Sequence, residues 1–148
     1  MFLRPRMLLA TLWVGSAWTI GYLVAPTLFA TLADSMQAGS IAGSLFRIEA
    51  WLSVACAAAM LLLLAAAARK DGGTGYRAQM IIVAAMLACT VIGYFGLQPF
   101  MAALRETAAV SGAMSAAART QFGVLHGIAS ALYLIQSLLG VALVWKMK

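Results

Sequence analysis

Two ionisable residues, His126 and Glu49, lie in apolar surroundings where they could carry chemistry. His126 is the only histidine and stands in the stretch "RTQFGVLHGIAS". Polar side chains follow it at steps of four, three and four residues: His126, Ser130, Tyr133 and Ser137. Because these steps place side chains on one face of a helix, the four are predicted to point into the protein.

Glu49 begins a second face of the same spacing, which contains Glu49, Ser53, Cys56 and Met60. Glu49 follows Phe46 much as His126 follows Phe122, so the two could face each other near one end of a bundle. A carboxylate beside an imidazole could bind a cation, relay a proton or orient a polar ligand. The alternative is structural: polar groups inside membrane bundles commonly hydrogen-bond across helices, at about 0.6 kcal/mol on average, and Arg47 or Arg119 could neutralise Glu49.

Two further faces complete the prediction of a shallow cavity that opens at one end. One contains Thr11, Gly15, Thr19, Tyr22 and Pro26, and the other contains Met86, Thr90, Tyr94 and Gln98. The predicted ligand-binding residues are Tyr22, Glu49, Tyr94, Gln98, His126, Ser130 and Tyr133. No catalytic residue, metal site or cofactor is predicted, and a binding protein is favoured over an enzyme.

The composition requires a lipid environment for the elements that carry these residues. The chain has 148 residues, 64% hydrophobic and 9% charged, against about 45–50% and about 25% in soluble domains. Four runs reach the roughly 20 residues that cross a bilayer core, at about 7–29, 46–68, 79–100 and 122–145. The first exceeds a signal-peptide core and is expected to be retained. The prediction is one all-α domain, an integral membrane four-helix bundle.

The basic residues indicate the orientation. Seven fall on one side of the predicted spans: Arg4, Arg6, Arg69, Lys70, Arg77, Lys146 and Lys148. Three fall on the other side: Arg47, Arg105 and Arg119. The positive-inside rule therefore predicts a multi-pass protein of the bacterial inner membrane with both termini in the cytoplasm.

An internal repeat suggests two helix hairpins related by an axis along the membrane normal. The first span ends "GYLVAPTLFATL" and the third "GYFGLQPFMAAL". Each is expected to bend at its proline, Pro26 or Pro99, and so to spread the bundle at the outer face. Each then enters a predicted outer loop, "ADSMQAGSIAGSL" or "RETAAVSGAMSAAARTQ".

Other motifs give weaker indications. Basic residues are scattered, so nucleic-acid binding is not expected, and Cys56 and Cys89 are interpreted as small buried hydrophobes. His126 with a methionine could ligate haem, and His126 with Met36, Met101 and Met114 could form a copper patch. Gly123 and Gly127 form a small-xxx-small pair suited to a neighbouring helix or to an oligomer.

The segments "APTLFATL", "AGSIAGSLF" and "FGVLHGIAS" together resemble the domain-of-unknown-function 4149 family, relatives of the transmembrane protein 205-like proteins. The resemblance runs from about Leu12 to about Leu139. It implies a small four-span membrane protein with no settled activity, whose shared features correspond here to Pro26, Phe29, Gly39, Gly43, Phe46, His126 and Gly127. Many relatives carry asparagine where this chain has Tyr133, which argues against an amide-based site.

Two other functions stay open beside a small-ligand, ion-binding or transport-accessory role in the lipid bilayer. A more distant likeness to four-helix copper-resistance and haem-biosynthesis membrane proteins suggests a redox protein that uses His126. The third is a structural subunit of a membrane complex.

Overall fold

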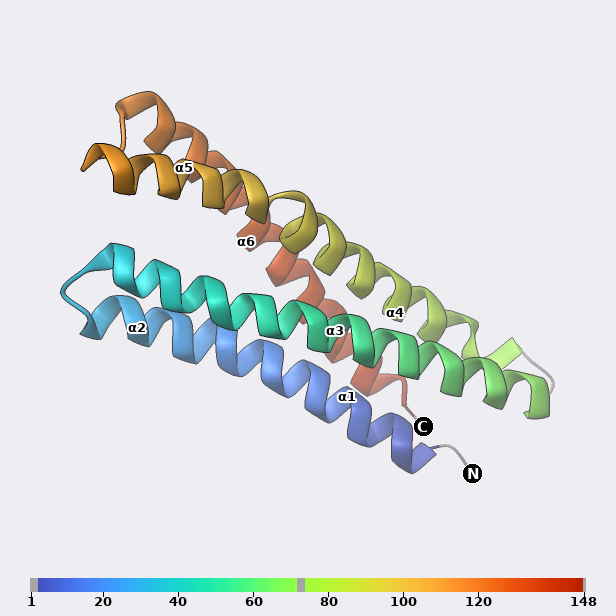
Figure 1. Ribbon diagram of the computed structural model, residues 1–148. Coiled ribbons are helices and arrows are strands. Elements are labelled where there is room, and N and C mark those ends of the chain that lie inside the picture. The colour runs from blue at the N-terminus through green and yellow to red at the C-terminus, as the bar shows by residue number, and fades with distance from the viewer. Residues whose placement is uncertain (1–2, 72–73, 148) are drawn as a thin grey trace.

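The computed structural model describes residues 3–71 and 74–147 and is helical almost throughout. Its elements form four long rods, drawn in Figure 1. The first rod comprises α1 (Leu3–Trp18), the π-helix η1 (Thr19–Val24) and α2 (Ala25–Thr31), and the second is α3 (Ser35–Asp71). After the 3₁₀-helix η2 (Thr74–Tyr76), the third comprises α4 (Arg77–Thr90), the π-helix η3 (Val91–Gly96) and α5 (Gln98–Ser111), and the fourth is α6 (Ala116–Trp145).

All four rods are long and apolar enough to cross a membrane, which confirms the predicted helical membrane bundle. We call the end that holds residues 3 and 147 the inner end and the opposite one the outer end, after the predicted orientation. With 37 residues, α3 is roughly 55 Å long. This exceeds a bilayer of about 40–45 Å including headgroups, so the helices extend beyond the hydrocarbon.

The outer loops are much shorter than predicted, because most of both segments is helical. Only residues 32–34 and 112–115 separate the helices there. Alanine-rich sequence favours helix strongly, and local caps fix the ends: the backbone N–H of Met36 donates to Asp34 Oδ1 (2.8 Å), and that of Ala118 donates to Ser115 Oγ (3.2 Å). Gly112 adopts a positive φ of 76° just after α5, a conformation that glycine tolerates.

The two π-helices occupy equivalent places in the sequence repeat. Each contains the Gly-Tyr pair and precedes the proline, in "TIGYLV" before Pro26 and "VIGYFG" before Pro99. Each closes with a backbone bond to the fifth residue back, from Ala25 N–H to the Ile20 carbonyl and from Leu97 N–H to the Ile92 carbonyl. A proline clashes with the carbonyl four residues before it, and the wider turn relieves that crowding.

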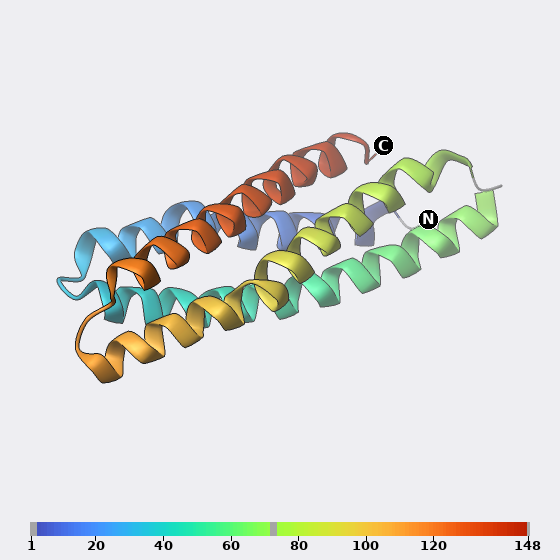
Figure 2. The same ribbon diagram turned by 90° about the horizontal axis from the view of Figure 1, so that it is seen from above.

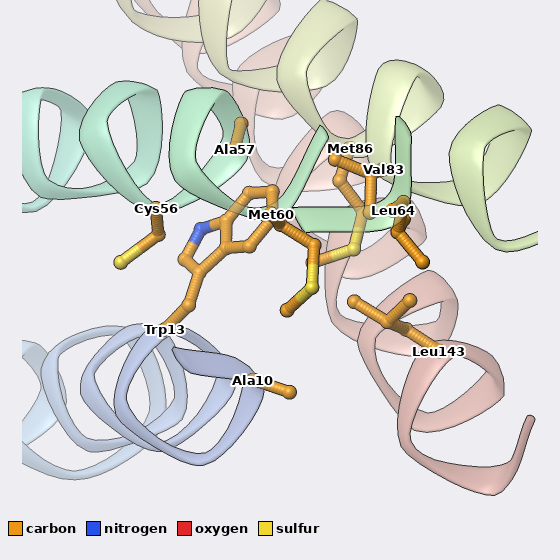
Figure 3. Packing of buried hydrophobic residues seen from close by; sticks show 9 residues of the cluster. All are labelled: Ala10, Trp13, Cys56, Ala57, Met60, Leu64, Val83, Met86 and Leu143. Carbon is orange, nitrogen blue, oxygen red and sulfur yellow. The ribbon is translucent and has the colours of Figure 1, made fainter. Parts of the chain in front are cut away.

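The inner half of the molecule is a closed ring of four helices. In it α1 packs on α3, α3 on α4, α4 on α6, and α6 on α1. The apolar core lies inside the ring and draws on all four helices, as Figure 3 shows: Ala10, Trp13, Cys56, Ala57, Met60, Leu64, Val83, Met86 and Leu143. Gly140 lets α1 approach α6 closely, since a methyl group there would lie 3.0 Å from a Val14 methyl.

A polar clamp joins three rods at the inner end. Arg6, buried on α1, donates from Nη1 to Gln79 Oε1 (3.1 Å) on α4. Gln79 Nε2 in turn donates to the Lys146 carbonyl at the end of α6 (2.6 Å). The Arg6 guanidinium also lies over the Tyr76 ring at 4.9 Å. Buried polar groups are thus paired across helices, which holds the inner end together.

The outer half separates into two hairpins, α2 with α3 and α5 with α6, which lie apart in Figure 1. In Figure 2, seen from above, the α5–α6 hairpin lies in front of the α2–α3 hairpin. Among the described residues, no Cα of α3 lies within 8 Å of a Cα of α5, and none of α2 lies so near α6. The backbone therefore spreads at the level of Pro26 and Pro99, as the prolines predict. Side chains, described below, reach across this space.

Candidate functional site

Glu49 is a buried carboxyl group on α3, only 3% exposed. The Ser53 hydroxyl, one turn along the same face, donates to Glu49 Oε1 (3.2 Å). Trp13 on α1 donates from Nε1 to Ser53 Oγ (2.7 Å), so the carboxyl is held through Ser53 to a second helix. The Ser16 hydroxyl also lies beside the carboxyl. The predicted face of Glu49, Ser53, Cys56 and Met60 is confirmed, since all four side chains are buried.

The second oxygen of this carboxyl is unpaired. Glu49 Oε2 is buried and has no hydrogen-bond partner among the described residues. An unpaired buried polar atom costs about 1–3 kcal/mol and more when charged, and intramembrane carboxyl groups are expensive to retain. Glu49 lies 20 residues from Arg69, hence roughly 30 Å along α3 from the inner basic residues. That is near the outer boundary of the hydrocarbon.

An aromatic cluster of Phe46, Tyr133 and Tyr22 lies beside Glu49. Phe46 lies one turn outward on α3 and meets the Tyr133 ring edge-on at 5.5 Å, and Tyr22 meets the same ring at 6.1 Å. Tyr133 donates to the Ala17 carbonyl (2.7 Å), and Tyr22 donates to Ser137 Oγ (2.9 Å). Tyr133 also lies near enough to interact electrostatically with Glu49. The fold thus brings three predicted site residues together: Tyr22, Glu49 and Tyr133.

Gly21 makes room for this cluster. A methyl group on Gly21 would overlap the Tyr133 ring. The glycine of the repeated Gly-Tyr pair therefore lets α6 present a tyrosine against the first rod. This gives the motif a packing role beside the Glu49 carboxyl.

Tyr94 and Gln98 lie at a different seam, between α3 and the third rod. Tyr94 packs edge-on against Phe95 (5.2 Å), and Phe95 in turn meets Trp51 of α3 at 5.3 Å. The Gln98 amide lies over Gly43 of α3. These two predicted residues lie where the third rod meets α3, while Tyr22 and Tyr133 lie at the contact of the first and fourth rods.

His126 and Ser130 are exposed, so the prediction that they point inward is wrong. The buried stripe of α6 contains Gln136, Ser137, Gly140 and Leu143. His126 stacks on Phe122, with parallel rings 6.0 Å apart. His126 shares a helix face with Tyr133 but lies seven residues, or two turns, farther out. No Cα of α2 or α3 lies within 8 Å of α6 among the described residues, so this outer part of the face stays uncovered. No hydrogen bond or ion pair joins His126 and Glu49 in the described structure.

Other sequence predictions need correction as well. The first-span face is wrong, because Thr11, Gly15, Thr19, Tyr22 and Pro26 are all exposed while Arg6, Ala10, Trp13 and Ala17 are buried. In the third span Met86 and Thr90 are buried as predicted. Within the described residues, nothing lies within 4 Å of a methyl group placed on Gly123 or Gly127, so this pair does not bring helices of the chain together.

The sequence prediction passed over several polar residues that the bundle buries. Trp13 and Gln136 are buried on α1 and α6, and Thr90 donates to Gln136 Oε1 (3.1 Å). Trp13 could have been found by its three- and four-residue steps from Ala10 and Ala17. For Gln136 the sequence gives no such signal, because one amide side chain in an apolar span does not indicate whether its helix face packs against the protein or faces lipid.

Two hollows border α6 among the described residues. A cavity of ≈ 10 Å³ lies beside Gln136, Ser137 and Tyr133, and is the size of one water molecule. A groove of ≈ 250 Å³ runs along α1 and α6, lined by Trp18, Tyr22, Leu134, Ser137, Leu138 and Val141. The described residues contain no group of three or more His, Cys, Asp or Glu side chains placed to hold a metal ion. Cys56 and Cys89 are free thiols.

Comparison with protein families gives one match. The sequence pattern of the domain of unknown function DUF4149 matches residues 8–110. The chain belongs to the DUF4149 family. The match includes Tyr22, Glu49, Tyr94 and Gln98 of this DUF4149 protein, whereas Tyr133 and His126 on α6 fall outside it. No curated protein and no solved structure matches the chain.

Family and fold together describe a multi-pass membrane protein whose inner half is closed and whose outer half is divided. Within this DUF4149 protein, the buried Glu49 carboxyl with its Ser53, Trp13 and Tyr133 neighbours is the strongest site for chemistry. A carboxyl oxygen with no donor can receive a proton, a small cation or a ligand N–H or O–H.

Proposed function

We propose that this DUF4149 protein binds a small cation, a proton included, at the Glu49 carboxyl within the membrane. The observation that carries the proposal is the buried Glu49 Oε2 with no partner among the described residues. Ionisable groups inside membrane spans commonly mark ion pathways or proton relays. The hydroxyls of Ser53 and Ser16 supply oxygen atoms beside the carboxyl, as hard cations require.

Access from the outer end accounts for the asymmetry of the fold. The inner end is joined by the Arg6–Gln79 clamp, whereas the backbones of the two hairpins diverge beyond the π-helices. The proposed route enters between the hairpins past Tyr94 and Gln98 and reaches Glu49 beside Phe46. Movement of the Phe46–Tyr133 pair would open the last step, since Phe46 lies one turn outward of Glu49 on α3 and its ring meets that of Tyr133.

The wider assignment follows the same reasoning. We propose the bacterial inner membrane as the location, with both termini in the cytoplasm, because the basic residues gather at the inner end. A transport-accessory role fits a binding site near one membrane face. We also propose that the protein is related to the transmembrane protein 205-like proteins. His126 and Ser130 stand on an exposed face and are not part of the proposed ion site.

Infrared difference spectroscopy on protein reconstituted in bilayers tests the site directly. Exchange of K⁺ for Na⁺ or Li⁺ should perturb a carboxyl band in the unmodified protein, and a stepwise change of pH should shift the same band in addition to those of the exposed acids. Glu49→Gln should remove this one band and its response to cations. Asp34→Asn is the matched control because Asp34 is an exposed acid at the outer end, and it should retain the response. If Glu49→Gln removes no band that responds to cations or to pH in the unmodified protein, the proposal fails.

Native mass spectrometry complements this test by asking whether a retained ligand depends on Glu49. Protein released gently from membranes should lose any such ligand on Glu49→Gln and keep it on His126→Ala. The opposite pattern would return the site to His126, the residue that the sequence alone favours.

A further inference from the structure

Arg105 reaches from α5 across the space between the two outer hairpins. Its Nη1 donates to the Gly39 carbonyl of α3 (3.3 Å), although no α3 and α5 Cα atoms lie within 8 Å of each other in the described chain. Its guanidinium also lies over the Phe122 ring of α6 at 5.7 Å. One side chain therefore touches both hairpins at the outer end.

The surface beneath Arg105 is bare backbone. A methyl group on Gly39 would lie 3.8 Å from Arg105 Nη1, and one on Gly43 would lie 3.8 Å from Nη2 and 3.5 Å from Gln98 Nε2. Gly39 and Gly43 are in α3, not in a loop as the sequence suggested, and they face the guanidinium and the Gln98 amide. Arg105 and Gln98 thus form a cradle in which a cation and an amide donor rest against α3 where it carries no side chain.

Most N–H donors of the Arg105 guanidinium have no acceptor among the described residues. An arginine carries five N–H donors, and the Gly39 carbonyl is the one hydrogen-bond acceptor that the described residues offer Arg105. No carboxylate among the described side chains forms an ion pair with it, although Asp34 and Glu106 are exposed at the same end. A half-buried cation without a counter-charge is unfavourable unless an anion completes it.

The depth of Arg105 indicates which anion is available. It lies 28 residues beyond Arg77 on the third rod, hence roughly 40 Å from the inner basic residues. The hydrocarbon core accounts for about 30 Å of that distance, so Arg105 lies at the level of the outer headgroups. Phosphate oxygens match the planar fork of a guanidinium, which binds them in a bidentate manner.

We infer that Arg105 and Gln98, over Gly39 and Gly43, form a binding site for a phosphate group between the outer hairpins. The phosphate of an anionic lipid headgroup is the source in reach, and free phosphate from the outer solution has the same chemistry. A phosphate in this cradle would bridge the hairpins through Arg105. The inference is independent of Glu49 and stands whether or not that carboxyl binds a cation.

Native mass spectrometry with added lipids tests the inference. Phosphatidylglycerol and phosphatidylcholine of identical acyl chains are titrated onto the protein and onto Arg105→Gln, Arg105→Lys and Arg119→Gln. Arg119 is the matched control, an exposed arginine at the same end outside the cradle. Each variant is first checked for unaltered helix content by circular dichroism.

We expect the unmodified protein and Arg119→Gln to retain phosphatidylglycerol in preference to phosphatidylcholine. Arg105→Gln should weaken phosphatidylglycerol binding about tenfold or more, since hydrogen bonds to charged groups contribute about 1.5–3 kcal/mol. Arg105→Lys should fall between them, because it keeps the charge and loses the fork. Millimolar inorganic phosphate that displaces the lipid would identify free phosphate as a ligand of the same cradle, and failure to displace it would identify the headgroup.

Equal phosphatidylglycerol affinity in Arg105→Gln and the unmodified protein, with no binding of inorganic phosphate to either, would overturn the inference. So would a loss of affinity as large in Arg119→Gln as in Arg105→Gln, which would indicate a general effect of charge. If Arg105→Gln fails to fold, Arg105→Lys decides, and an affinity equal to that of the unmodified protein then contradicts the bidentate site.

Discussion

Replacement of Gly21 by alanine tests whether the repeated Gly-Tyr motif makes room for the aromatic cluster beside Glu49. The new Cβ would overlap the Tyr133 ring, so the ring must move. Its displacement would disturb the hydrogen bond from Tyr133 to the Ala17 carbonyl and the edge-on contacts with Phe46 and Tyr22. Gly15→Ala is the matched control, because it lies on the same rod and nothing described lies within 4 Å of the new methyl group.

The magnitude follows from three contributions. Glycine to alanine in a helix is favourable by about 0.5–1 kcal/mol when the site is free, and this is the expected gain for Gly15→Ala. For Gly21→Ala the same gain is opposed by one interhelical hydrogen bond, about 0.6 and at most about 1.7 kcal/mol in a membrane. Loss of aromatic edge contacts opposes it by about 0.5–1.5 kcal/mol more. We therefore expect Gly21→Ala to be less stable than Gly15→Ala by about 1–3 kcal/mol.

The assay is reversible unfolding in mixed micelles, followed by circular dichroism as the fraction of denaturing detergent rises. Gly15→Ala should unfold at or above the midpoint of the unmodified protein, and Gly21→Ala below it. In the background of Tyr133→Ala the two glycine variants should become equivalent, since the overlapping ring is gone. Equal stability of Gly15→Ala and Gly21→Ala with Tyr133 present would refute the packing argument.

Three further predictions concern the core, the inner clamp and the topology. Trp13→Phe and Ser53→Ala should each lower stability by about 1 kcal/mol and act less than additively together, because both remove the Trp13–Ser53 hydrogen bond; full additivity in a double-mutant cycle would contradict that link. Gln79→Ala should lower the free energy of unfolding by about 1–3 kcal/mol, because it leaves a buried guanidinium and the Lys146 carbonyl without this partner, whereas the exposed Arg4→Ala should change it by less than about 0.5 kcal/mol. In a background with Cys56 and Cys89 replaced by alanine, an impermeant thiol reagent should label Ala33→Cys and Ala113→Cys from one side of the membrane and Gly75→Cys from the other. Labelling of Ala33→Cys and Ala113→Cys from opposite sides would contradict the four-span arrangement.

The features of the fold that depend on the length and hydropathy of the apolar segments were predictable from the sequence. Four apolar runs of sufficient length require four membrane helices, and the short inner turn after α3 makes the helices antiparallel neighbours. The repeat predicted a bend at each of Pro26 and Pro99, and the structure places a π-helix just before each of these prolines. The length of the outer loops was not predictable by the same reasoning. Their serine and glycine residues are typical of loops, whereas their alanine residues have a high helix propensity, and the two signals oppose each other.

Part of the candidate site could likewise be predicted from the sequence, and part depends on how the helices pack. By itself the sequence predicted, from steps of four, three and four residues, that Glu49, Ser53, Cys56 and Met60 share an inward helix face, and all four are buried. Only the tertiary structure decided that Tyr133, and not His126, comes to Glu49. Both side chains lie on one face of α6, two turns apart, but only the inner part of that face packs against the first rod, while no Cα of α2 or α3 lies within 8 Å of α6 in the described chain. Periodicity gives the members of a helix face, whereas packing against neighbouring helices gives the direction in which that face points.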